Sequence, residues 1–126
     1  MNYVLKVYYQ TGDSFHHEDT HETVDYEWRD EDVARENAKA ITEHYNAYFR
    51  EHTFGWCGGK PDKSYKGAWW YKPADWNGAD IGPVIRLKLD DGRLVDYCCP
   101  WCGFFESLHY VEVAIKEMIF YPEVGY

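Results

Sequence analysis

The segment 83–103 constrains the fold more than any other part of the chain, because it holds the pattern of a β-hairpin that leads into cysteines. Aliphatic and polar residues alternate over positions 85–90, as expected of a strand with one buried face. Asp91-Gly92 follows, a dipeptide that tolerates the positive φ angles of a tight turn. Alternation resumes over residues 94–99, so we predict the returning strand there.

The first half of the chain predicts two more strands. Alternating apolar residues mark a strand over 3–9, and the polar segment 14–21 after it is expected to be a loop. A second strand is predicted over 20–28, with Val24, Tyr26 and Trp28 on its inward face. These two strands are expected to pair as an antiparallel hairpin with an enlarged connection.

A helix is predicted over 30–51 from the spacing of its apolar residues. They recur every three or four positions and form one stripe: Ala34, Ala38, Ile41, Tyr45 and Tyr48. Asp30 precedes the helix, and its carboxylate is suited to cap the first turn.

The second half is less regular. Residues 53–82 form a long Gly/Trp-rich, insertion-like loop in which the one possible strand covers 68–72. Residues 104–118 fit either a helix or a turn at 104–108 followed by a last strand, and we favour the strand. With 45% apolar residues, the chain of 126 residues is expected to fold as a single domain, 1–126. The predicted order is ββαβββ, an α+β fold in which one antiparallel sheet of about five strands carries the helix on one face.

The charge balance bears on the partner. The formal net charge is −9, which disfavours general nucleic-acid binding because affinity for the nucleic-acid backbone comes from neutralised phosphates. No apolar run is long enough for a membrane helix or a secretory signal, so a cytoplasmic protein that does not bind membranes is expected.

The run Cys99-Pro100-Trp101-Cys102-Gly103 has three interpretations. It can be a zinc knuckle, completed by Cys57 and by either His52 or Cys98. It can be a glutaredoxin-type dithiol, although such motifs precede a helix near the start of the domain. It can also be a turn with inert, buried thiols. We expect no cofactor, with zinc as the alternative.

The Trp-rich segment is the candidate binding site. Trp69 and Trp70 are adjacent, and in an extended strand they would point to opposite faces, which would leave one indole for a partner. Neighbouring aromatic rings and outward-facing cations would complete a surface for stacking and for an anionic group. The predicted binding residues are Trp69, Trp70, Tyr71, Trp76, Arg86 and Lys88.

Three segments resemble a family of small tailed-phage and prophage proteins without assigned biochemistry: YVLKVYYQTGDSFHHEDTHETVDYEW, VARENAKAITEHY and PWCGFFESLHY. The shared features are a TGDSF turn, a DYEW strand and a WCGFFE run. The resemblance implies an accessory protein of the host cytoplasm that counters a host defence or a host enzyme.

We therefore expect a non-enzymatic binding protein that occupies a host protein surface or sequesters a small nucleotide signal. The alternative is a small zinc-stabilised or thiol-active domain centred on the CPWCG run. A homo-oligomer is compatible with either hypothesis.

Overall fold

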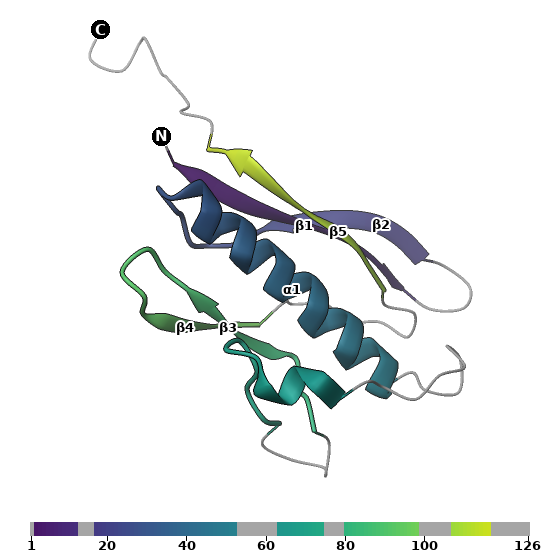
Figure 1. The fold of residues 1–126 in the computed structure, drawn as a ribbon. Coiled ribbons are helices and arrows are strands. Elements are labelled where there is room, and N and C mark those ends of the chain that lie inside the picture. Colours follow the sequence, from purple (N-terminus) through teal and green to yellow (C-terminus); the bar gives the residue numbers. More distant parts are fainter. Residues whose placement is uncertain (1, 13–16, 53–62, 75–79, 99–106, 117–126) are drawn as a thin grey trace, which may run out of the picture.

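The computed structural model describes residues 2–12, 17–52, 63–74, 80–98 and 107–116, and its elements follow the order ββαβββ. Figure 1 shows the elements in the order β1 (Tyr3–Gly12), β2 (His17–Thr23), α1 (Glu31–His52), the 3-10 helix η1 (Lys63–Gly67), β3 (Val84–Lys88), β4 (Leu94–Cys98) and β5 (Ser107–Ile115). One main helix packs against antiparallel strands, so the predicted α+β class is confirmed. The strands form two sheets, however, and not the single sheet that was predicted.

The larger sheet has the order β2-β1-β5, with the first strand of the chain in the centre. Its inner face carries the buried residues Leu5, Val7 and Tyr9 of β1. The partners of Leu5 and Val7 on β5 are Val113 and Val111, which pack against the same core. One face of the sheet is therefore apolar.

The second sheet is the predicted hairpin of β3 and β4. Its register runs from Val84 opposite Cys98 to Lys88 opposite Leu94. Gly92 has φ of +87°, the conformation for which the Asp91-Gly92 turn was predicted. The burial of β3 alternates along the strand, with Ile85 and Leu87 fully buried.

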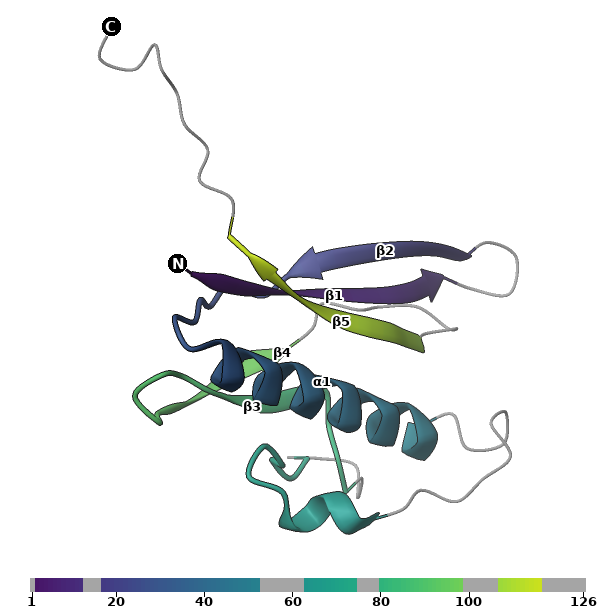
Figure 2. The same ribbon diagram turned by 45° about the horizontal axis from the view of Figure 1, so that its top comes forward.

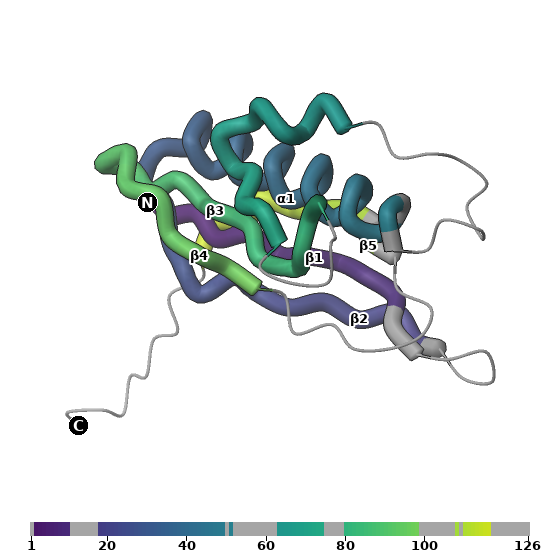
Figure 3. Tube along the Cα trace, turned by 90° about the horizontal axis from the view of Figure 1, so that it is seen from below, coloured from purple at the N-terminus to yellow at the C-terminus, as the bar shows by residue number. Residues whose placement is uncertain are grey.

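The helix α1 is capped as predicted. The Oδ1 atom of Asp30 accepts hydrogen bonds from the amides of Asp32 (2.9 Å) and Val33 (3.3 Å). Below the larger sheet, α1 and the β3–β4 hairpin lie side by side (Figures 2 and 3). Ile41 is fully buried in a cluster that also holds residues of both sheets, so the domain has one continuous core.

The backbone of Lys88 links three distant segments of the chain. The indole Nε1 of Trp28 donates to its carbonyl oxygen (2.7 Å), as does the Nδ2 of Asn37 (2.8 Å). The Lys88 amide donates in turn to the Oδ1 of Asn37 (2.7 Å). These bonds fix the end of β3 against the start of α1.

Two strand predictions were wrong, one in its bounds and one altogether. The second strand covers His17–Thr23 and not 20–28, because backbone pairing with β1 extends the strand into the polar segment expected to be a loop. Trp28 forms only an isolated bridge with Tyr3. The possible strand at 68–72 is a turn that follows η1, with the Tyr71 amide bonded to the carbonyl of Ala68 (3.2 Å).

Of the ambiguous residues 104–118, the described part forms a strand, since β5 covers Ser107–Ile115 and so includes the last two residues of the predicted turn at 104–108. Residues 104–106 and 117–118 lie outside the described residues. Among the described residues, no helix is both long enough and apolar enough to cross a membrane.

Candidate functional site

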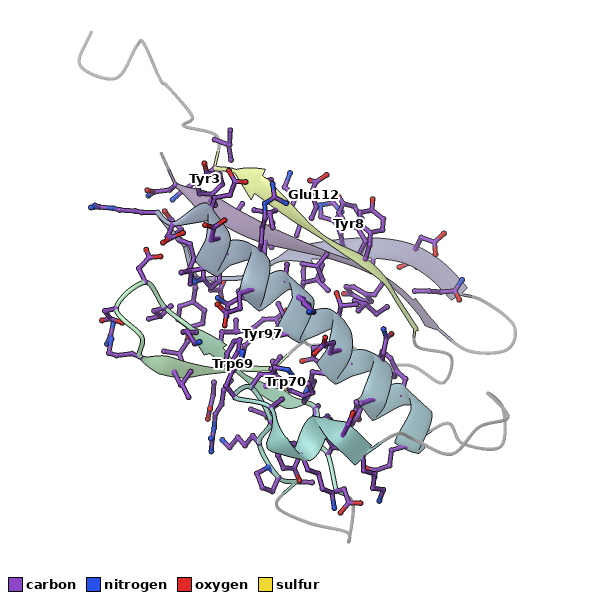
Figure 4. The ribbon with its side chains drawn as sticks, viewed as in Figure 1. Tyr3, Tyr8, Trp69, Trp70, Tyr97 and Glu112 are labelled. Atoms are coloured by element: carbon purple, nitrogen blue, oxygen red, sulfur yellow. The ribbon has the colours of Figure 1, made fainter. Side chains whose placement is uncertain are left out.

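Trp69 and Trp70 lie on the turn after η1, next to α1 and β3 (Figure 4). Trp70 is 3% exposed and belongs to the core, where its ring lies 6.4 Å from that of Tyr65. Trp69 is only partly buried, and the Nζ atom of Lys88 lies 4.5 Å from the centre of its ring, within cation–π distance. The two indoles therefore have different environments, although they are not on an extended strand.

Beside the two tryptophans, the surface of α1 is hollowed in two adjoining places. The first hollow has a volume of about 300 Å³ and is lined by Glu36, Lys39, Ala40, Glu43, Ala68, Trp69 and Trp70. The second has about 360 Å³ and is lined by Glu43, Asn46, Ala47, Ser64, Tyr65, Ala68 and Trp70. They share Glu43, Ala68 and Trp70, and together we call them the Trp groove.

Arg86 and Lys88 lie on the outward face of β3, where they alternate with buried Ile85 and Leu87. The Arg86 amide donates to the carbonyl of Trp70 (3.2 Å), which attaches the Trp-rich turn to β3. The Lys88 ammonium donates to Glu36 on α1 (3.0 Å). Trp69, Trp70, Arg86 and Lys88, which were predicted to act together, are thus neighbours.

The Tyr71 hydroxyl donates to the carbonyl of Asp80 (2.7 Å), and its ring lies 5.4 Å from that of Tyr65. Tyr71 therefore connects the Trp-rich turn to Asp80 and to Tyr65 of η1. Trp76, the last aromatic residue of the prediction, lies outside the described residues.

A charged cluster holds η1 and the Trp-rich turn in place. Asp80 accepts hydrogen bonds from the ammonium groups of Lys63 and Lys66, and these bonds lower the pKa of its carboxyl group. The hydrogen bond to Asp80 also raises the pKa of Lys63. Glu51 of α1 accepts a hydrogen bond from the amide of Ile81 (3.0 Å). The lysines near this end of the groove are thus engaged by carboxylates.

His44 lies directly under Trp70 and has no exposed surface. Its ring meets Trp70 edge-on at 5.4 Å and Tyr45 at 4.6 Å. Burial lowers the pKa of His44 to about 3, and the nearby backbone of Gly82 offsets this only in part. Although the Gly82 backbone is near the ring, neither ring nitrogen has a well-aligned hydrogen-bond partner within the described part of the chain. Trp70, which lines the groove, therefore packs on its inner side against a neutral, buried histidine.

A separate hollow of about 380 Å³ lies where β2 approaches β4, and its charged groups are acidic. Its lining is Glu22, Thr23, Asp25, Tyr26, Asp96, Tyr97 and Cys98. The Tyr97 hydroxyl donates to Glu22, and Lys72 donates to Asp96 (2.6 Å). The first bond joins the two sheets, and the second connects the segment after the Trp-rich turn to β4.

The zinc prediction depends on residues that the structure does not describe. Cys57, Cys99 and Cys102 lie outside the described residues, as does the side chain of His52. Cys98, the alternative ligand, is exposed, and partial burial together with the charge of Glu22 raises the pKa of its thiol. Within the described ranges, no group of three or more His, Cys, Asp or Glu side chains is placed to hold a metal ion. Zinc stays a prediction, which metal analysis of protein purified without chelator would test.

The sequence prediction missed the wall of the groove that α1 supplies. Glu36, Ala40, Glu43 and Ala47 are spaced by four, three and four residues, so they form a second stripe beside the apolar one. Small residues alternate with carboxylates in this stripe. That pattern could have indicated a face that packs against a neighbouring segment without being fully buried.

Comparison of the chain with protein-family models, with curated proteins and with solved structures gave no match.

Proposed function

We propose that the chain is a non-enzymatic binding protein that receives a side chain of a partner protein in the Trp groove. In the phage setting implied by the resemblance, the partner would be a host factor such as a defence protein. The observation that carries the proposal is Trp69, a partly buried indole held at the rim of the groove by the turn after η1. Aromatic residues placed in this way are common anchors of protein interfaces.

The charges of the groove favour a protein over a nucleotide. Glu36 and Glu43 line the groove, and the Nζ atom of Lys39 lies 3.9 Å from the Oε1 atom of Glu43. Lys88 is bonded to Glu36, so its charge is already neutralised in part. A phosphate entering here would meet two carboxylates and would have to displace one of them from a lysine. A basic or aromatic side chain would instead meet carboxylates and an indole face, both of which attract cations.

The proposal is tested by comparing the parent with the Trp69→Ala variant. Immobilised parent protein is incubated with lysate of a bacterial host, and the retained proteins are identified and quantified. Trp69→Ala is expected to lose the retained partner at least about tenfold while its melting temperature stays close to that of the parent, since Trp69 is not a fully buried residue.

Tyr110→Ala is the matched control. Tyr110 is an aromatic residue that is 52% exposed on β5, in the other sheet, and this variant should retain the partner as well as the parent does. Equal retention by the parent and Trp69→Ala would overturn the proposal. Calorimetry with nucleotides separates the other hypothesis, because tight nucleotide binding that is lost in Lys88→Ala would favour a nucleotide ligand.

A further inference from the structure

The strand β5 is an edge of the larger sheet, and alternate residues along it direct their backbone N–H and C=O groups away from β1. Tyr3 of β1 exchanges both of its backbone hydrogen bonds with Trp28, on the β2 side. The amide of Lys116 donates to the carbonyl of Asn2 (2.8 Å), on the β5 side. Because successive residues of an antiparallel strand direct their polar groups to opposite neighbours, Val111, Val113 and Ile115 point theirs away from β1. Among the described residues, no strand lies on that side.

The side chains along this edge are mostly apolar. Val111, Val113 and Ile115 face the same side as the core residues of β1. Ile115 is 55% exposed, and Tyr110 on the opposite face is 52% exposed. Within the described chain, large apolar residues this exposed are otherwise represented only by Leu94. Within the described ranges, the edge therefore combines backbone groups that no strand pairs with and partly exposed apolar side chains.

The other edge of the same sheet differs in character. The sequence of β2 is HEDTHET, and Glu18, Asp19 and Glu22 would meet any strand that approached it. Charged residues of this kind protect a sheet edge from unwanted pairing. Between Tyr110 and Ile115, by contrast, the only charged residue is Glu112.

We propose that the β5 edge binds an extended strand of a partner protein, which would become the fourth strand of the sheet. Its backbone would bond to Val111, Val113 and Ile115. Its inward-facing residues would be aliphatic and would cover Ile115. Its outward-facing residues would be basic, because the chain has a net charge of −9, although Glu112 itself is already opposite Lys6 of β1. This surface is independent of the Trp groove.

The position of α1 argues against a second copy of the chain as the occupant. The helix lies beneath β5 and is closer to β5 than to β1 (Figure 3). Two β5 strands paired across the edge would be about 4.8 Å apart. Their helices would then be on the same face of the joined sheet and only about 5–10 Å apart, at or below the roughly 8–10 Å that helix packing requires. A lone strand carries no helix and avoids this crowding.

The probe is a synthetic peptide with the sequence KVKVKVK, and its matched control is KKVVVKK, which has the same composition without the alternation. Amide hydrogen exchange is followed by NMR in the full chain. KVKVKVK is expected to slow exchange at Val111, Val113 and Ile115 by at least about tenfold. The amides of β2 should be unaffected, and the control peptide should have no effect.

Two proline variants form a second, independent test. Ile115→Pro and Thr23→Pro each remove an outward-pointing amide from the last residue of an edge strand. Only Ile115→Pro is expected to weaken binding of KVKVKVK, whereas Trp69→Ala should bind it as the parent does.

Three outcomes would overturn the proposal. In the first, KVKVKVK leaves exchange at the three β5 amides unchanged. In the second, it protects the β2 edge equally. In the third, the β5 amides become protected as the chain is concentrated without peptide, which would identify a second copy as the occupant.

Discussion

At the scale of single residues, two polar side chains of α1 face the core with opposite outcomes. Asn37 and His44 are both fully buried. Asn37 uses both of its amide atoms in hydrogen bonds, to Val33 and to the backbone of Lys88. His44 has no partner for either nitrogen among the described groups. Asn37 therefore stabilises the fold, whereas His44 costs stability, most of all in acid.

The pH dependence of stability should reveal His44. The folded protein takes up a proton at His44 only near pH 3, whereas the unfolded chain does so near its ordinary value of 6.5. Between these values the unfolded state binds more protons, so the free energy of unfolding falls as the pH is lowered, by about 1.4 kcal/mol per pH unit.

Replacement of His44 by leucine should remove this contribution and, by removing two unpaired nitrogens, raise the stability at pH 7 by about 1 kcal/mol. Urea denaturation between pH 4 and 7, applied to the parent and to His44→Leu, provides the measurement. Parallel pH profiles for the two proteins would show that His44 is hydrated in the folded state.

At the scale of elements, the contact between α1 and β3 depends on Asn37. Asn37→Ala would leave the part-buried amide of Lys88 without an acceptor and should cost about 1–3 kcal/mol. Asn46→Ala is the matched control, since Asn46 is on the same helix but only partly buried, and it should change stability by less than about 0.5 kcal/mol. Chemical denaturation of both variants tests this, and equal losses would contradict it.

The sequence predicted the elements that have their own periodicity. The stripe from Ala34 to Tyr48 and the β3–β4 alternation lie within a few residues of the observed α1, β3 and β4. The start of β2 could not be predicted, because HEDTHET has no apolar alternation and becomes a strand only through pairing with β1. A strand was predicted only as a possibility over 68–72, and the segment instead forms the turn after η1, which is hydrogen-bonded to β3.

For the candidate site, prediction from sequence was more successful with the residue set than with its geometry. Trp69 and Lys88 were predicted in one site and are in contact. Asn37 and His44 were missed, although they lie four residues before and three after Ile41 and so fall on the same stripe. Polar residues on an apolar stripe indicate a buried hydrogen-bonding position, or an unsatisfied one.

At the scale of the whole molecule, the two sheets share one core around α1, so they should unfold together. Ile41 is fully buried in that core, and Ile41→Asp would place an unpaired charge there at a cost of several kcal/mol. Both sheets should then lose structure in a single transition at a lower temperature than in the parent. Thermal unfolding followed by NMR signals from β1 and from β3 is the measurement. A variant that melts like the parent would mean that the helix is wrongly placed.

The central position of β1 has a consequence for how the protein is made. Tyr3 pairs with Ile115, so β1 gains its second neighbour only from a strand that lies far along the chain, after β2, α1, β3 and β4. Such distant pairing slows folding, because the loop must close before the contact contributes. Until β5 has been synthesised, Leu5 and Val7 have no neighbour on that side of the sheet. We therefore expect this edge of β1 to be a chaperone-binding site in the nascent chain.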